Sequence, residues 1–191
     1  MKRVSIAFLF LFIAVSLSAQ PNKYGTGLIF DDEAYQNTPM KATLVRGMYG
    51  GSLPSSASLK KYTPKPKTQG NYGTCVGWST AYAALTIVDA IENGWTNQEK
   101  ITQNTFSPGF IYSEIKNPSD YGCKFGAWIN DAFEIMKTKG AVRLSDFDED
   151  CPGNISADLY QNAAEHKISG YAKIFGLTDS DKYKIEATKK S

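Results

Sequence analysis

The sequence has very little histidine, and it has no block of charge of one sign. His166 is the only histidine among 191 residues, and 21 Lys and Arg side chains nearly balance 19 Asp and Glu side chains, for a formal net charge of +2. Nucleic-acid-binding proteins usually carry a basic patch or tail, so we expect no nucleic-acid partner. The acidic residues near Asp148 lack the spacing of a calcium loop. We therefore expect no metal site and no cofactor.

Long apolar runs are confined to the N-terminus. Residues 1–19, MKRVSIAFLFLFIAVSLSA, begin with a basic pair, continue with an apolar run and end in small residues. This order predicts a secretory signal peptide and not a transmembrane span. We therefore predict a secreted, periplasmic or cell-envelope protein with no integral membrane segment after signal removal. Loss of Lys2 and Arg3 would bring the formal charge to zero.

Cysteine is also scarce, with three residues at positions 75, 123 and 151. In an oxidising compartment two of them can form a bridge, and neither Cys123 nor Cys151 has another plausible partner. We predict a disulfide between Cys123 and Cys151, for which chain-entropy arguments give a stabilisation on the order of 3 kcal/mol. Cys75 should stay free.

Cys75 stands where a glycine-broken loop changes to a helical pattern, in KTQGNYGTCVGWSTAYAALTIVDA (residues 67–90). From Trp78 to Ile91 apolar residues recur at helical spacing, which places Cys75 in the first turn of a helix. Backbone N–H groups and the helix dipole at that end stabilise a thiolate, the reactive form of cysteine. A buried, inert cysteine is the commoner alternative, but the setting favours a nucleophile, and Gln69 could donate to a developing oxyanion beside the Cys75 amide.

The stretch QGNYGTCVGWS resembles the segment around the active-site cysteine of papain-family (C1) peptidases. The resemblance implies that Cys75 is the nucleophile and that Gln69 lies in the oxyanion hole, while Gly73 lets a substrate backbone approach. The sequence departs from the family at Tyr72, where a cysteine usually stands. That missing cysteine is the usual partner of the one that Cys123 resembles, so the predicted pairing with Cys151 is not the usual one.

Two downstream stretches extend the resemblance to the N-terminal portion of the family, its left lobe. In NTFSPGFIYSEI, Ser107 is expected to cap a helix whose first residue is Pro108. In YGCKFGAWINDAFEIMKTKGAV, Gly126 falls on the glycine whose backbone pairs with the substrate, and Phe125 replaces a second glycine.

The domain boundaries and the α+β fold class follow from this resemblance. Residues 20–52 are expected to form an N-terminal extension laid over the surface, because they show no sustained period. Residues 53–166 would form the helical left lobe, and residues 167–191 only the start of the β-barrel right lobe. After Cys151 we predict a helix at 156–166, a strand at 167–177 and a helix at 180–191.

The single histidine limits the function that the resemblance implies. A cysteine peptidase needs a histidine to move protons and an Asn or Asp to orient it. In the papain family they lie roughly 130 to 150 residues after the cysteine, and His166 is much closer to Cys75. We predict a secreted papain-like cysteine peptidase that acts on peptide or protein substrates, here as an inactive fragment without the catalytic His and Asn. A catalytically inactive binding module and a cell-envelope structural protein remain alternatives.

Overall fold

The computed structural model describes residues 26–41, 55–151 and 153–190. The predicted signal peptide, residues 1–19, lies outside these described residues. The described chain is rich in helix and contains a two-stranded sheet, so the predicted α+β class is confirmed. In chain order the elements are β1 (Leu28–Ile29), α1 (Asp32–Asn37), the 3₁₀ turn η1 (Lys60–Tyr62), α2 (Cys75–Gly77), the π-helical η2 (Trp78–Leu85), α3 (Thr86–Glu92), α4 (Gln98–Gln103), α5 (Pro108–Ile115), β2 (Ala127–Trp128), α6 (Ile129–Thr138), α7 (Ala157–Ala163) and α8 (Asp181–Lys190).

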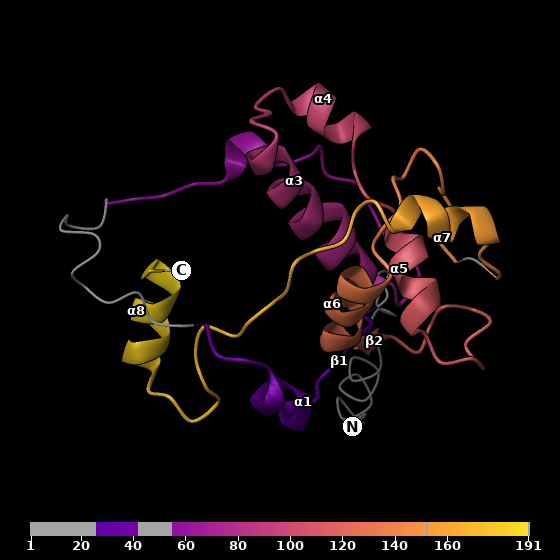
Figure 1. The fold of residues 1–191 in the computed structure, drawn as a ribbon. Helices are drawn as coiled ribbons and strands as arrows, with labels where there is room; N and C mark the ends of the chain where they lie inside the picture. Colours follow the sequence, from indigo (N-terminus) through magenta and orange to yellow (C-terminus); the bar gives the residue numbers. More distant parts are fainter. Residues whose placement is uncertain (1–25, 42–54, 152, 191) are drawn as a thin grey trace, which may run out of the picture.

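A single continuous helix, built from α2, η2 and α3, runs through the middle of the molecule (Figure 1). It begins at Cys75, as the apolar spacing predicted, and ends before Gly94, whose φ of 64° only a glycine adopts easily. Val76, Ala81 and Leu85 are buried along its inner face. This helix therefore connects the position of Cys75 to the hydrophobic core.

Helix α5 packs between the central helix and α6. The Ser107 hydroxyl accepts a hydrogen bond from the Phe110 N–H at 3.1 Å, and Pro108 is the first helical residue, so the predicted cap is confirmed. Nearly the whole circumference of α5 is buried, because α2, η2, α6 and α7 surround it. Its core side chains are Phe110, Ile111, Tyr112 and Ile115.

The first part of the N-terminal extension contains two elements that the sequence did not suggest. Asp31 caps α1 by accepting a hydrogen bond from the Ala34 N–H at 2.8 Å. Before it, β1 pairs in parallel with β2, with Leu28 opposite Ala127 and Ile29 opposite Trp128. The extension therefore joins the sheet instead of only covering the surface.

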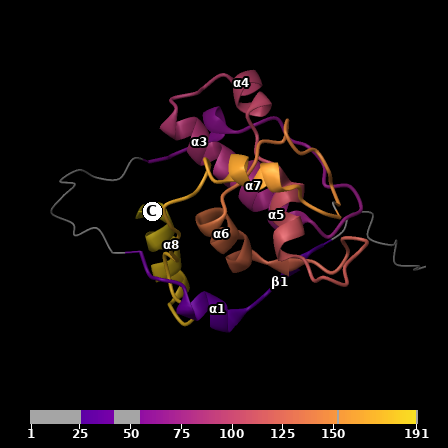
Figure 2. The same cartoon turned by 45° about the vertical axis from the view of Figure 1, so that its right-hand side comes forward.

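The chain after His166 crosses to the N-terminal segment and packs against it. The Tyr35 hydroxyl donates to the Phe175 carbonyl at 2.8 Å, and Met40 forms an isolated bridge with Lys173. Both views show α8 beside α1 and away from the main helices (Figures 1 and 2). The predicted helices at 156–166 and 180–191 are confirmed as α7 and α8.

The predicted strand at 167–177 is wrong. In this range only Lys173 has a strand-like pairing, with Met40. A strand is stabilised by a neighbouring strand that takes up its N–H and C=O groups. The neighbouring segment, residues 38–41, offers one short contact and no ladder.

Cys123 and Cys151 are joined by a disulfide, with their Cα atoms 5.7 Å apart. Cys75 is a free thiol. The bridge fixes the loop of residues 120–126 to the segment that precedes α7.

Among the helices of the described ranges, none has the length and apolar character needed to cross a membrane.

Candidate active site

Cys75 is the first residue of the central helix, and its side chain is half-buried. The loop before it is held by two hydrogen bonds. The Gln69 side-chain amide donates to the Tyr72 carbonyl at 2.9 Å, and the Gly73 N–H donates to the Cys123 carbonyl at 2.6 Å. The loop therefore presents the sulfur at the helix N-terminus from a fixed backbone.

An extended segment of the chain itself lies across this thiol. We call residues 26–30 the N-terminal strap. The Gly27 N–H donates to the Cys75 Sγ at 3.2 Å, and the Gly27 carbonyl accepts from the Ala127 N–H at 2.8 Å. The strap includes β1, which pairs with β2. The strap is thus an extended segment of the chain that pairs with β2 as a neighbouring strand.

The two glycines expected to contact substrate, Gly73 and Gly126, both lie against Gly27 of the strap. A Cβ atom on Gly27 would come within 1.7 Å of the Gly73 carbonyl oxygen, and one on Gly126 within 2.3 Å of the Gly27 carbonyl oxygen. Gly126 also has a φ of 80°, which disfavours any other residue. The structure therefore brings Gly73, Gly126 and Cys75 together around one backbone.

The recorded contact between the strap and the thiol is a hydrogen bond. The Gly27 amide nitrogen donates its proton, and the Cys75 sulfur accepts it. The strap therefore covers part of the thiol, whose side chain is half-buried.

A buried polar pair that the sequence analysis did not single out lies behind the strand edge. Tyr112 and Asp120 are 0% and 1% exposed, and the Tyr112 hydroxyl donates to the Asp120 carboxylate at 2.8 Å. Burial alone would raise the pKa of Asp120, but hydrogen bonds from the Lys124 N–H, Tyr112 and the Phe125 N–H lower it below its ordinary value. Burial and the Asp120 carboxylate raise the pKa of Tyr112. Nothing in the sequence indicated this pair, because Tyr112 lies among the core residues of α5 and Asp120 lies in the loop that follows.

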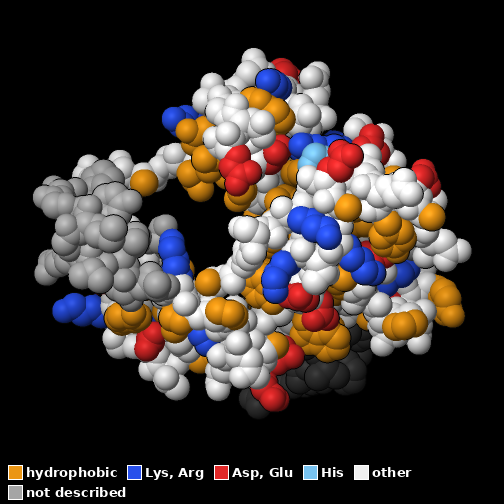
Figure 3. Space-filling model, viewed as in Figure 1, with side chains coloured by type: hydrophobic (Ala, Val, Ile, Leu, Met, Phe, Trp, Pro, Cys, Tyr) orange, Lys and Arg blue, Asp and Glu red, His pale blue; other side chains and the backbone are white. Residues whose placement is uncertain are grey.

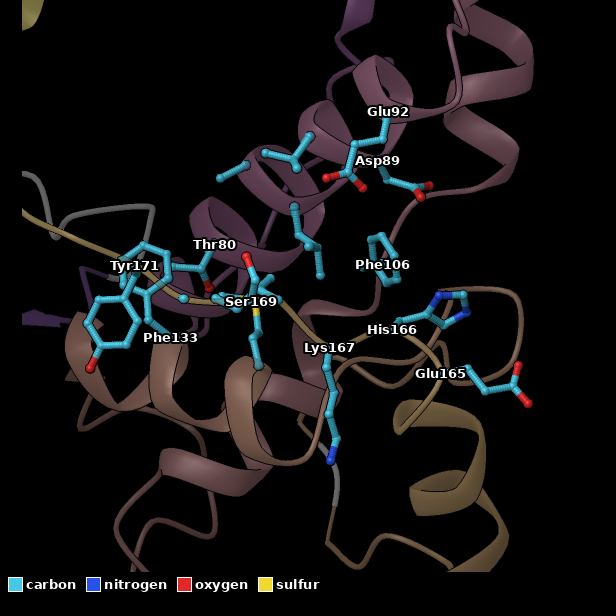
Figure 4. A pocket seen from close by; sticks show the side chains of 16 residues that line it. Thr80, Asp89, Glu92, Phe106, Phe133, Glu165, His166, Lys167, Ser169 and Tyr171 are labelled. Carbon is cyan, nitrogen blue, oxygen red and sulfur yellow. The ribbon is translucent and has the colours of Figure 1, made fainter. Parts of the chain in front are cut away.

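His166 lies in a different place from Cys75. It lines a cavity of about 450 Å³ beside the central helix, together with Asp89, Phe106 and Lys167 (Figure 4). Cys75 is not among the residues lining this cavity. The histidine ring packs edge-on against Phe106, with ring centroids 5.3 Å apart, and it is visible at the surface among charged side chains (Figure 3). His166 and the Cys75 thiol therefore do not line the same cavity.

The ranges that the structure describes contain no group of three or more His, Cys, Asp or Glu side chains that could hold a metal ion.

The fold is similar to that of papain-like cysteine proteases. One similar solved structure is xylellain, a cysteine protease from Xylella fastidiosa, with a TM-score of 0.58 and 18% identity over 86% of this chain and 62% of that chain. Another is the digestive procathepsin L2 proteinase from the larval midgut of Tenebrio molitor, with a TM-score of 0.58 and 22% identity over 81% of this chain and 48% of that chain.

These similarities concern the fold. The chain spans less than two thirds of the length of either structure. No family model matches the sequence, and the search of curated proteins gives no significant match.

Proposed function

We propose that this chain is the nucleophile-bearing lobe of a secreted papain-like cysteine peptidase that hydrolyses peptide bonds through Cys75. The observation that carries the proposal is the strap, an extended backbone that pairs with β2 and contacts the Cys75 sulfur. A site that already holds one extended peptide at a thiol has the shape needed for a peptide or protein substrate.

In the proposed reaction the Cys75 thiolate attacks the carbonyl carbon of a substrate peptide bond. The Cys75 backbone N–H and the Gln69 side-chain amide are the donors assigned to the developing oxyanion. The amine then leaves with a proton, and water hydrolyses the thioester. Each proton transfer needs an acid or base, for which general catalysis contributes about 10² to 10⁴-fold.

A second lobe is proposed as the source of that acid and base. His166 lines a cavity away from Cys75, so it does not fill the role in the described ranges. Similar solved structures are considerably longer than the part that matches this chain, which supports further chain in a complete enzyme. Residues 53–166 are assigned to the left lobe and residues 167–191 to the start of the right lobe.

A catalytically inactive binding module is the second candidate. It is favoured by the same strap, which covers the thiol, and by the distant setting of His166. In this case the edge at β2 would bind peptides and release them uncut.

The two candidates differ in the reactivity of Cys75. We expect the chain without residues 1–19 and with Gly27→Ala, which moves the strap off the thiol, to show no turnover of a fluorogenic peptide, but to be labelled at Cys75 by a peptidyl chloromethyl ketone faster than an unstructured cysteine peptide is. Cys75→Ala should abolish labelling. Labelling no faster than that of the cysteine peptide would overturn the peptidase proposal and favour the binding module.

Hydrolysis that is lost in both Cys75→Ala and His166→Ala would contradict the assignment of the base to a second lobe. That result would make His166 the proton-transfer group and would require it to move to the thiol.

A further inference from the structure

We infer that Tyr112 and Asp120 are positioning residues. They hold the peptide-pairing edge (residues 126–128) in a fixed position relative to Cys75. This inference rests on the proposed function of the site as a peptide-binding thiol site. Neither side chain needs to touch a substrate, since both act through the backbone of the 120–126 loop.

The first step is that the Asp120 carboxylate organises the loop. One oxygen accepts the Lys124 N–H at 2.8 Å, and the other accepts the Phe125 N–H at 3.1 Å and the Tyr112 hydroxyl at 2.8 Å. Three donors therefore converge on one buried carboxylate, which fixes the backbone immediately before Gly126.

The second step is that Tyr112 connects this carboxylate to the edge. Its hydroxyl oxygen accepts the Gly126 N–H at 3.1 Å while its proton is donated to Asp120. Gly126 is buried, so this N–H would otherwise lack a partner at considerable cost. Because Asp120 is ionised and Tyr112 neutral, the hydroxyl donates to Asp120 and keeps a lone pair directed at Gly126.

The third step is that the same loop holds the backbone before the nucleophile. The Cys123 carbonyl accepts the Gly73 N–H at 2.6 Å. A Cβ atom on Gly73 would lie only 3.0 Å from the Lys124 carbonyl oxygen, so the two backbones are in close contact. The buried Asp120 carboxylate therefore fixes the position of the edge that binds the peptide and also that of the loop that presents Cys75.

The test compares two alkylating reagents at Cys75. Iodoacetamide needs access to the sulfur alone, whereas benzyloxycarbonyl-Phe-Ala chloromethyl ketone also gains from pairing with the edge. Each ratio is measured in the Gly27 chain and again with Gly27→Ala, which moves the strap off the thiol and removes its effect on both rate constants. The ratio of the two rate constants therefore measures how much the peptidyl reagent gains from pairing with the edge. General destabilisation does not change this ratio as long as the protein stays folded.

We expect Tyr112→Phe and Asp120→Asn to lower this ratio at least tenfold. The matched control is Tyr160→Phe, which removes another tyrosine hydroxyl that donates to a carboxylate, that of Glu114 on α5. It should leave the ratio within twofold of the wild type. Circular dichroism at the assay temperature confirms that each variant is folded, and Asp120→Asn, which keeps the side chain's size, serves if Tyr112→Phe does not fold.

A ratio unchanged in a folded Tyr112→Phe or Asp120→Asn protein would overturn the positioning role while leaving the proposed function in place. A wild-type ratio equal to that of a free cysteine peptide would instead overturn the proposed function, and this inference with it.

Discussion

At the scale of single residues, His166 is the group whose charge responds to pH near neutrality. Burial beside Phe106 lowers its pKa, and Arg143 lowers it further, while Asp89, Glu165 and Asp146 act in the opposite direction. Arg143 is itself paired with Asp89 at 2.8 Å and lies over the Phe106 ring. The folded surroundings thus favour the neutral imidazole.

We therefore expect acid to destabilise the protein through His166. The unfolded chain binds this proton with the ordinary pKa near 6.5, and the folded chain binds it at lower pH. The contribution is fully present above about pH 7.5 and is lost as the pH falls through 6.5 toward the folded pKa, with a slope of at most about 1.4 kcal/mol per pH unit.

Urea unfolding of the wild type and of His166→Gln between pH 5 and 8 measures this effect. The variant should show a flatter dependence over this range. Equal slopes for the two proteins would mean that another group is responsible.

At the scale of elements, the strap depends on glycine at position 27. In Gly27→Ala the new methyl group would meet the Gly73 carbonyl oxygen at 1.7 Å, so the strap has to move away from the thiol. We expect iodoacetamide to alkylate Cys75 at least tenfold faster in this variant than in the wild type.

The matched control is Gly170→Ala, because a Cβ atom there meets nothing within 4 Å. It should react at the wild-type rate. A Gly27→Ala protein that reacts no faster than the control would show that the strap does not limit access to Cys75.

Elements defined by local signals could be predicted from the sequence, and those defined by distant partners could not. The Ser107-Pro108 cap of α5 and the helical start at Cys75 depend on neighbouring residues alone. The pairing of Leu28 with Ala127 joins residues far apart in the chain through a two-residue strand, too short to show a period. The alternation at 167–177 was misleading because a strand also requires a partner.

The same division applies to the site. The spacing of Gln69, Gly73 and Cys75 was visible because these residues share one loop. The contact between Gly27 and the sulfur, and the support of Gly126 by Tyr112 and Asp120, depend on the folded arrangement. Nothing in their local sequence distinguishes these residues from ordinary core or loop positions.

At the scale of the whole molecule, the disulfide joins the 120–126 loop to the segment before α7 across a sequence separation of 28. Replacing both cysteines by alanine should lower the free energy of unfolding by on the order of 3 kcal/mol, since the open loop gains entropy in the unfolded chain. Urea unfolding of the double variant Cys123→Ala/Cys151→Ala measures the loss.

Cys75→Ala provides the comparison for that experiment, because it removes a thiol without opening a loop. Thiol counting gives a second check, and one reactive thiol is expected in the folded, unreduced protein. Three reactive thiols would contradict the bridge.

The chain that carries the strap is anchored at points away from the thiol, and this affects how the site can be studied. Beyond β1, the chain that continues from the strap is tied to the C-terminal segment through Tyr35 and Phe175 and through Met40 and Lys173. The strap is thus a tethered ligand, for which short flexible connections give effective concentrations on the order of millimolar. A peptide added to the intact chain has to compete with that concentration, so its measured affinity will be weaker than that of the uncovered site. Cutting the chain between the strap and α1 would lower the local concentration of the strap to that of a free fragment, without changing any atom that contacts the substrate.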